Sequence, residues 1–373
     1  EQSMLNLTGD ILTPKGWLQG SMVITGAQVS HMHGTLVSED VVMKRDEPKF
    51  IPGFIDLHVH GGAGVDLMSG VNSLGHIARH QIKYGTTSFL ATTMTAPLSE
   101  LEHVLTGIKQ HISHTIEKDQ AEVLGIHLEG PYINPGRLGA QPAWTRDIVL
   151  AEILHLNEIA PIRVLTLAPE CVGDRHLIEH LTQMGIRIQI GHSHGSYEDG
   201  VTALKHGASG FTHLFNAMTP LHHREPGMVG AALAHAQYAE LIPDLLHVHP
   251  GAIHVALRAI PHLYCVTDGT AATGMPDGMY MLGSQEVNKC LGGVRLKDGT
   301  LAGSTLTMID ALRNLHSIGL SVAEASQCLS TRPAQYLGLN NRGLLVEQAI
   351  ADIVVIDKHL HLNTVYTRGE AHA

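Results

Sequence analysis

The stretch Phe54-Ile55-Asp56-Leu57-His58-Val59-His60 is a short apolar run that ends in a His-x-His pair. A run of this length, rich in β-branched and aromatic residues, is typical of a buried strand. Successive side chains on a strand point to opposite faces, so His58 and His60 share one face. The stretch therefore predicts a buried strand that brings two imidazoles together at its carboxyl end.

Seven similar runs follow along the chain, and helical patterns such as 174–184 and 197–206 lie between most of them. The runs span residues 88–93, 123–129, 163–168, 187–192, 210–213, 240–247 and 263–268. Buried parallel strands that alternate with helices are the pattern of an α/β barrel. The sequence predicts the α/β fold class, with a (β/α)8 barrel of the TIM type.

The two ends of the chain have a different pattern. Residues 5–49 alternate apolar and polar residues in short bursts, and residues 351–357 form another apolar run after a helical region. These features favour strands at both ends. We expect a small β-sandwich domain built from residues 1–49 and 341–373, beside a barrel of residues 50–340.

Composition narrows the class of protein. The chain has 373 residues, 44% of them hydrophobic and 16% charged, with a net charge of −11. This charge disfavours nucleic-acid and anionic-membrane surfaces, although a local arginine would still bind a small anion. The four cysteines lie far apart, residues 1–4 show no secretion signal, and no apolar run reaches membrane-helix length. We expect a cytoplasmic protein that binds neither nucleic acid nor membrane.

The carboxyl ends of the predicted strands are rich in possible metal ligands and acid–base groups. Active sites of TIM-type barrels lie at these ends, and the chain has 28 histidines. One such residue alone is more often a core histidine or a capping carboxylate, whereas coincidence across six strand ends is improbable. The residues are His58, His60, Glu129, His192, His213, His247 and Asp268.

A catalytic divalent cation needs imidazole and carboxylate ligands and one open position. Glu129, His192 and His213 supply such a set from three strands, and Asp268 is left to accept a proton. By contrast, His176-Leu177-Ile178-Glu179-His180 matches the H-x-x-E-H metalloprotease pattern but falls in a predicted outer helix. We therefore expect that second pattern to lie on the surface.

Several motifs resemble those of a known family. They are residues 52–61 (PGFIDLHVHG), 127–132 (HLEGPY), 191–193 (GHS), 212–218 (THLFNAM), 224–227 (REPG), 267–268 (TD) and 301–304 (LAGS). In this order they resemble the amidohydrolase superfamily and, within it, the N-acetylglucosamine-6-phosphate deacetylases, over nearly the whole chain. Residues 273–278 (TGMPDG) and 221–224 (LHHR) are also similar to the N-acetylgalactosamine-6-phosphate deacetylases.

The resemblance implies roles for individual residues. Glu129, His192 and His213 match the ligands of the main metal, and Asp268 matches the catalytic acid–base. The substrate contacts that it implies are Ala140, Gln141, Asn216, Ala217, Arg224, His247, Leu301, Ala302 and Gly303. It further implies a divalent cation, zinc before iron or manganese, and a homodimer in which the partner subunit closes the phosphate end of the substrate site.

Some positions depart from the family pattern. Certain members have Gln-x-Asn and one metal where this chain has His58 and His60, so these two histidines imply a possible second ion. Gln141 stands where many members have histidine, and Leu245 replaces a common glycine. Leu245 leaves the backbone near His247 open to question.

The implied reaction is hydrolysis of the acetamide of N-acetylglucosamine 6-phosphate to glucosamine 6-phosphate and acetate. Asp268 acts first as base and then as acid, and His247 is a catalytic residue that hydrogen-bonds the developing oxyanion. Three alternatives stay open. They are the galacto epimer as substrate, the reaction of another amidohydrolase, and a non-catalytic barrel that serves as a scaffold.

Overall fold

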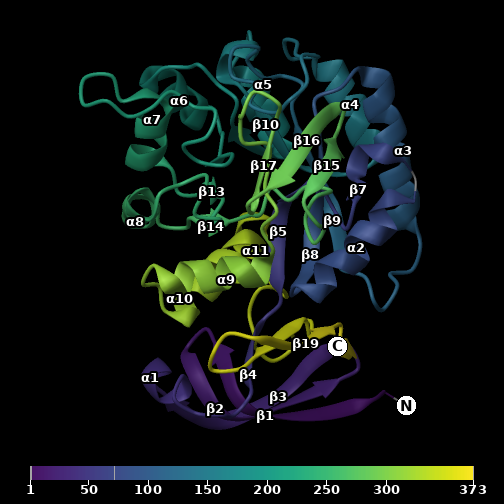
Figure 1. Cartoon of the computed structure of the whole chain (residues 1–373), viewed down its shortest axis with the longest axis vertical. Helices are drawn as coiled ribbons and strands as arrows, with labels where there is room; N and C mark the ends of the chain where they lie inside the picture. Colours follow the sequence, from purple (N-terminus) through teal and green to yellow (C-terminus); the bar gives the residue numbers. More distant parts are fainter. Residues whose placement is uncertain (1, 71, 373) are drawn as a thin grey trace.

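The computed structural model describes residues 2–70 and 72–372, with a barrel above and a separate sheet below it in Figure 1. Glu1 and Ala373, the outer ends of the predicted sheet segments, lie outside the described residues. Within the described ranges, no helix is long and apolar enough to cross a membrane.

Six parallel strands form one curled sheet in the order β12-β11-β10-β9-β8-β5. They are β5 (Phe54–Val59), β8 (Thr86–Thr93), β9 (Glu122–Glu129), β10 (Ile162–Leu167), β11 (Arg187–Ile190) and β12 (Gly210–Phe211). Every residue of β5 and β8 is buried, as expected where parallel strands are covered on both faces.

Two further parallel strands, β13 (Glu240–Leu241) and β14 (Tyr264–Cys265), complete the barrel. The backbone N–H of Leu214, after β12, donates to the carbonyl of Glu240 over 2.8 Å. The N–H of Asp268, after β14, donates to the carbonyl of His58 over 2.9 Å. The first bond joins β12 to β13, and the second joins β14 to β5. The eight strands therefore close into a ring, and the predicted (β/α)8 barrel is confirmed.

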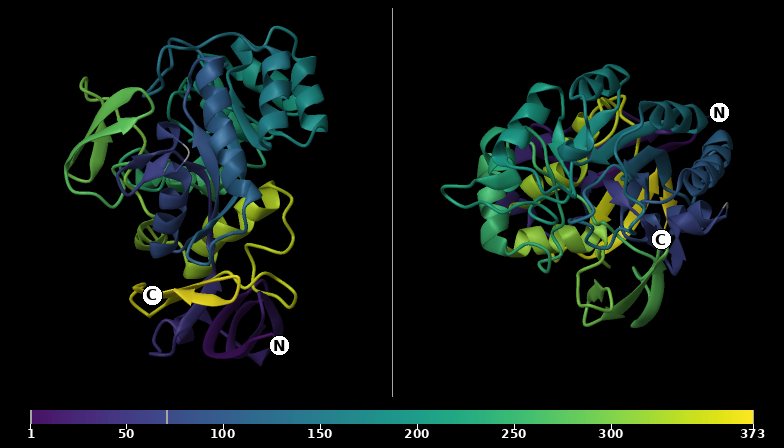
Figure 2. Two further views of the ribbon diagram at one scale, coloured as in Figure 1. Left: turned by 90° about the vertical axis from the view of Figure 1, so that its right-hand side faces the viewer. Right: turned by 90° about the horizontal axis from the view of Figure 1, so that it is seen from above.

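Helices surround the barrel (Figures 1 and 2). They are α2 (Ser73–Lys83), α3 (Leu98–Ser113), α4 (Leu150–Ile159), α5 (His176–Gln183), α6 (Tyr197–Lys205), α7 (Gly227–His235), α8 (Pro250–Ala259), α9 (Met308–Ser317), α10 (Val322–Ser326) and α11 (Arg332–Tyr336). Ser196 and Asp199 form a capping box at the start of α6, which satisfies backbone N–H groups that the helix leaves free. The predicted helices at 174–184 and 197–206 are confirmed within two residues.

Both chain ends contribute to a separate seven-stranded sheet in the order β20-β19-β18-β4-β1-β2-β3, as predicted. Its strands are β1 (Met4–Thr13), β2 (Gly16–Thr25), β3 (Gln28–Val37), β4 (Lys49–Pro52), β18 (Ile353–Ile356), β19 (Leu362–Thr367) and β20 (Glu370–His372). A bridge between Gln28 and Ile350 brings its edge strand β3 back towards β18. The sheet thus curls over a core of its own, while the domain boundaries at 49/50 and 340/341 stay a prediction.

One element was not expected from the sequence. After β14, the strands β15 (Gly278–Leu282), β16 (Gln285–Cys290) and β17 (Gly293–Arg295) form an antiparallel sheet. Figure 2 shows it in green beside the barrel mouth. Its strands are short and largely exposed, so they lack the continuous apolar run that marks a core strand.

Candidate active site and metal centre

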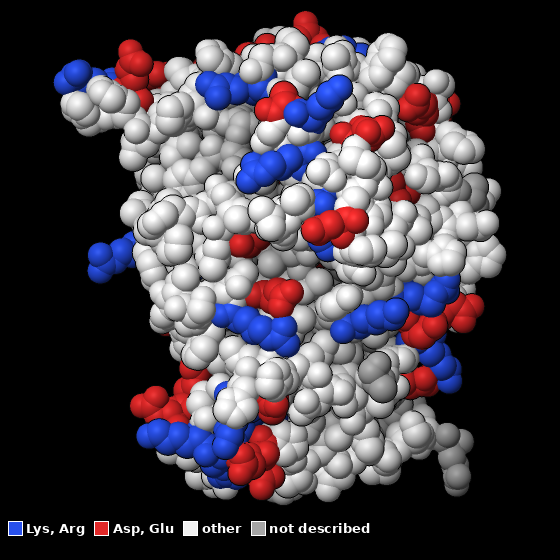
Figure 3. All heavy atoms as spheres, in the orientation of Figure 1, with Lys and Arg blue, Asp and Glu red and all other residues white. Residues whose placement is uncertain are grey.

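A cavity of about 350 Å³ opens at the carboxyl end of the barrel strands. Its lining includes the following sequence-predicted residues: His60, Glu129, Ala140, Gln141, His192, His213, Asn216, Ala217, His247, Asp268, Leu301 and Gly303. The face of the molecule in Figure 3 shows Lys and Arg interspersed with Asp and Glu, without a continuous basic patch.

The carboxylate of Glu129, at the end of β9, lies between two pairs of histidines. Its Oε1 is 3.3 Å from Nε2 of His58 and 3.0 Å from Nε2 of His60. Its Oε2 is 3.2 Å from Nε2 of His192 and 3.4 Å from Nε2 of His213. Each carboxylate oxygen thus faces one imidazole pair, so Glu129 could contribute a ligand atom on either side.

The other ring nitrogen of each of these histidines already has a partner. Nδ1 of His60 lies 3.0 Å from the carbonyl of Thr92, and Nδ1 of His192 lies 2.8 Å from the carbonyl of Arg137. Nδ1 of His213 lies 3.1 Å from the carbonyl of Asn216. A carbonyl only accepts, so each Nδ1 carries the proton and each Nε2 lone pair is free for a ligand.

These Nε2 atoms crowd together. Nε2 of His58 and His60 lie 3.1 Å apart, and so do Nε2 of His192 and His213. Two nitrogen lone pairs at this distance repel each other, and the nearby carboxylates add negative charge. A positive charge between the nitrogens would relieve this repulsion. The donor set of Glu129, His192 and His213, and the set of His58, His60 and Asp268, therefore both fit a divalent cation.

The electrostatics of the cluster also favour a bound cation. Burial opposes the charged form of His58, yet Asp268, Glu240 and Glu129 raise its pKa well above the usual value. Against the same burial, hydrogen bonds to Asp268 and Glu129 raise the pKa of His60 to about 9. The carboxylates therefore favour positive charge at His58 and His60, and a bound cation would supply that charge in place of protons.

Asp268 follows β14 and is 8% exposed. Its Oδ1 lies 3.2 Å from Nε2 of His58 and 3.1 Å from Nε2 of His60. Burial would raise the pKa of Asp268, but His58 and His60 hold it below the usual range. The carboxylate is thus ionised beside the proposed metal ligands, as a general base must be.

His247 lies on the cavity wall and is held by Asp244, a residue that the sequence analysis did not single out. Oδ2 of Asp244 lies 2.7 Å from Nδ1 of His247, and Oδ1 accepts the N–H groups of Leu246 and His247. Leu245 adopts φ +63°, the conformation that glycine takes most easily. The backbone turn is therefore kept despite the leucine side chain.

Two predicted substrate contacts lie away from the cavity lining. Ala302 is fully buried in the small core that packs against the sheet of β15, β16 and β17. Arg224 is exposed, and its Nη1 lies 2.8 Å from Nε2 of the neighbouring His223. Among the cavity-lining residues that the structure describes, Arg137 is the one arginine or lysine. The sequence analysis missed it because it stands in an irregular loop after β9.

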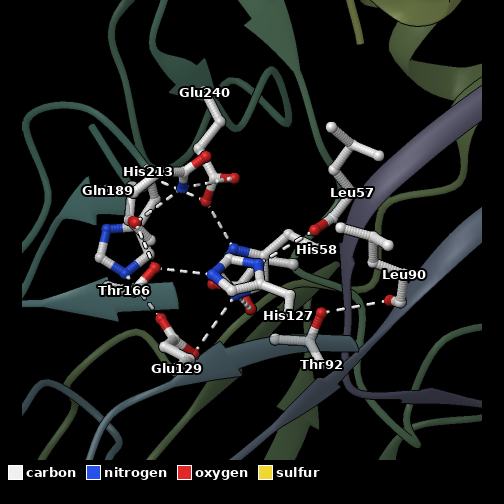
Figure 4. A network of polar contacts seen from close by, with 12 residues as sticks. Leu57, His58, Leu90, Thr92, His127, Glu129, Thr166, Gln189, His213 and Glu240 are labelled. Carbon is white, nitrogen blue, oxygen red and sulfur yellow. Dashed lines mark hydrogen bonds and ion pairs between the residues drawn. The ribbon is translucent and has the colours of Figure 1, made fainter. Parts of the chain in front are cut away.

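Figure 4 shows a second missed residue, Glu240 on β13, which is completely buried and contacts Nδ1 of His58 over 2.5 Å. The carboxylate starts a two-residue strand, and a strand so short has too little periodicity to reveal which face it presents. The H-x-x-E-H pattern lies on the surface, as expected. Its Glu179 contacts His176 and His206 there.

Comparison with known proteins places the chain in a family. Residues 50–371 match the Amidohydrolase family. The chain is 39% identical to N-acetylgalactosamine-6-phosphate deacetylase of Escherichia coli O157:H7 over 369 residues, covering 96% of this chain and 97% of the relative. It is 38% identical to N-acetylglucosamine-6-phosphate deacetylase of Lysinibacillus sphaericus over 362 residues, covering 95% and 92%.

A solved structure agrees with these relatives. N-acetyl-D-glucosamine-6-phosphate deacetylase of Mycobacterium smegmatis, as a mutant in complex with N-acetyl-D-glucosamine-6-phosphate, superposes with a TM-score of 0.89 at 30% identity. The superposition covers 99% of both chains. The chain therefore belongs to the amidohydrolase family and, within it, to the group of amino-sugar-6-phosphate deacetylases.

Proposed function

We propose that the protein hydrolyses the acetamide of N-acetylglucosamine 6-phosphate to glucosamine 6-phosphate and acetate. The observation that carries this proposal is the Glu129 carboxylate between two histidine pairs at the floor of the cavity, with Asp268 beside it. The relatives of the same group support the substrate class. A non-catalytic scaffold would have no need for such a cluster.

We propose that Glu129, His192 and His213 hold one divalent cation, most suitably zinc, and that His58, His60 and Asp268 hold a second. Zinc fits because imidazole nitrogens and carboxylate oxygens are its ordinary ligands, although iron and manganese take similar sets. A bound divalent cation polarises a carbonyl oxygen and lowers the pKa of water.

Asp268 moves the proton in the proposed reaction. Its carboxylate accepts a proton from the attacking water and then donates it to the sugar nitrogen, because an amide does not readily expel an unprotonated amine. His247 is oriented by Asp244 through its Nδ1 and lines the cavity. From there it hydrogen-bonds the substrate and stabilises developing charge.

The phosphate group needs a cation, since the net charge of −11 repels a dianion. Arg224 is exposed and does not line the cavity of its own chain. We propose that the protein is a homodimer in which Arg224 enters the cavity of the partner subunit. A guanidinium offers paired donors for phosphate oxygens.

The galacto epimer is the second candidate substrate, favoured by the 39% identity to the Escherichia coli N-acetylgalactosamine-6-phosphate deacetylase. We further propose a cytoplasmic location, because the four cysteines are free in the described chain.

Parallel kinetics on the two epimeric 6-phosphates test the proposal. Metal-loaded protein should release acetate from N-acetylglucosamine 6-phosphate with the higher kcat/KM. A higher value for the galacto epimer would support the second candidate. Absence of acetate release from both would refute deacetylation of either sugar phosphate.

A further inference from the structure

We propose that Glu240 is a positioning residue that makes His58 a metal ligand and so gives the barrel its second cation. The inference rests on the proposed metal centre. It concerns a residue that lies outside both proposed ligand sets. Figure 4 shows the geometry, with His58 between Glu240 on one side and Glu129 on the other.

The two nitrogens of His58 contact carboxylates on opposite sides of the ring. Nδ1 lies 2.5 Å from Oε1 of Glu240. Nε2 lies 3.3 Å from Oε1 of Glu129 and 3.2 Å from Oδ1 of Asp268. With its proton on Nδ1, the ring turns the Nε2 lone pair towards the centre of the barrel. Glu240 therefore selects both the tautomer and the direction of His58.

His58 differs from the other three histidines in this respect. His60, His192 and His213 place Nδ1 against backbone carbonyls, whereas His58 places it against a carboxylate. A carboxylate partner increases the basicity of an imidazole ligand. The chain thus provides its strongest imidazole ligand at the second cation.

The surroundings hold Glu240 in place. Its Oε1 also accepts the backbone N–H of His213 over 3.1 Å, and its Oε2 lies 3.4 Å from Nε2 of Gln189. Gln189 in turn accepts the hydroxyl of Tyr264 over 2.7 Å. The ring of His127 packs edge-on against His58 with centroids 4.7 Å apart. Glu240 and His58 therefore have little freedom to reorient.

The charge balance of the buried cluster gives an independent reason to link Glu240 to the second cation. Glu129, Asp268 and Glu240 bring three carboxylates into one buried cluster. One divalent cation neutralises two of them and leaves one buried negative charge, which is costly in a low-dielectric interior. A second divalent cation reverses the sign and leaves one net positive charge, whereas without the Glu240 carboxylate two uncompensated positive charges would be left. Loss of the Glu240 charge should accordingly weaken the second cation more than the first.

Metal content provides the test. Protein stripped by a chelator is dialysed against increasing free Co²⁺ or Mn²⁺, and ions per chain are measured by mass spectrometry. Wild type should reach two ions. Glu240→Ala should keep the first ion and bind the second about 10- to 100-fold more weakly. Glu240→Gln retains one acceptor oxygen without the charge, so it should fall between these two.

Two further variants separate positioning from general damage to the core. Tyr264→Phe removes a hydroxyl from the same buried network without touching His58, so it should still bind two ions. Glu240→Ala combined with His58→Gln should bind the second ion no more weakly than His58→Gln alone, because both changes remove the same ligand.

The assignment is overturned if wild type never exceeds one ion, if Glu240→Ala binds the second ion as tightly as wild type, or if Tyr264→Phe loses it equally. Acetate release is measured separately on the same samples. Two bound ions without deacetylation would refute the proposed function and leave the role of Glu240 intact. Deacetylation by wild type that never binds more than one ion would refute the role of Glu240 and leave the proposed function intact.

Discussion

The side-chain amide of Gln141 donates a 2.8 Å hydrogen bond to Oε1 of Glu129, the oxygen that faces His58 and His60. The Gln141 carbonyl accepts the backbone N–H of Thr95, also over 2.8 Å. Gln141 thus contacts the central carboxylate through a neutral amide.

Gln141→Ala should weaken metal binding about 10-fold or more, because it removes a partner that orients a ligating carboxylate. The measurement is ions per chain at set free Zn²⁺, together with kcat/KM for the sugar phosphate. Gln141→Glu, which places a like charge beside Glu129, should also lose activity. Unchanged metal affinity in Gln141→Ala would show that the hydrogen bond does not matter for binding.

Glu129→Gln should abolish tight metal binding, because an amide carries no charge to share between the two histidine pairs. Glu179→Gln is the matched control, since Glu179 also lies between two histidines but on the surface. The control should keep the metal content and turnover of wild type. Full metal occupancy in Glu129→Gln would contradict its role as the central ligand.

Asp268→Asn should lower kcat by roughly 10²–10⁴-fold and change KM little, because asparagine keeps the shape of aspartate but accepts no proton. Steady-state acetate release measures both constants. Asp298→Asn, in an exposed turn outside the cavity lining, should behave as wild type. Comparable kcat values for the two variants would remove Asp268 from the reaction.

Arg224→Ala should lower kcat/KM for the phosphorylated substrate about ten- to a hundred-fold, since a charged hydrogen bond contributes about 1.5–3 kcal/mol. Hydrolysis of the unphosphorylated acetamido sugar should hardly change. If Arg224 acts across a dimer, co-expressed Arg224→Ala and Asp268→Asn chains should form heterodimers with one intact site and regain activity. Equal losses on both substrates, or no complementation, would contradict phosphate binding by the partner's arginine.

His80 on α2 should make the protein less stable in mild acid. Burial lowers its pKa to about 4, and its Nε2 has no hydrogen-bond partner within the described residues. The unfolded chain binds a proton near pH 6.5. The stability that the protein has with His80 neutral and buried is therefore fully present above about pH 6.5. It is lost as the pH falls towards about 4.

Urea unfolding between pH 4.5 and 7.5 measures this dependence. The free energy of unfolding of His80→Gln should fall less steeply with decreasing pH than that of wild type at the same metal loading. Parallel curves for the two proteins would mean that His80 does not titrate in this range.

The sequence by itself determined the order of the barrel strands and most of the central residues. The period-two alternation in 54–60 places His58 and His60 on one face, and this local rule needs no knowledge of the rest of the fold. Apolar runs likewise locate β9 and β11, and therefore Glu129 and His192 at the ends of strands. Local periodicity suffices for such positions because strand burial leaves a pattern along the chain.

Contacts between distant segments were decided only by the tertiary structure. Glu240 and His58 are 182 residues apart and meet because β13 and β14 complete the barrel next to β5. Arg137 reaches the cavity wall from an irregular loop, whereas Arg224 is exposed. Loop paths depend on packing against the whole barrel and leave no periodic signal. Ligand types could therefore be read from the sequence, but the carboxylate that orients His58 could not.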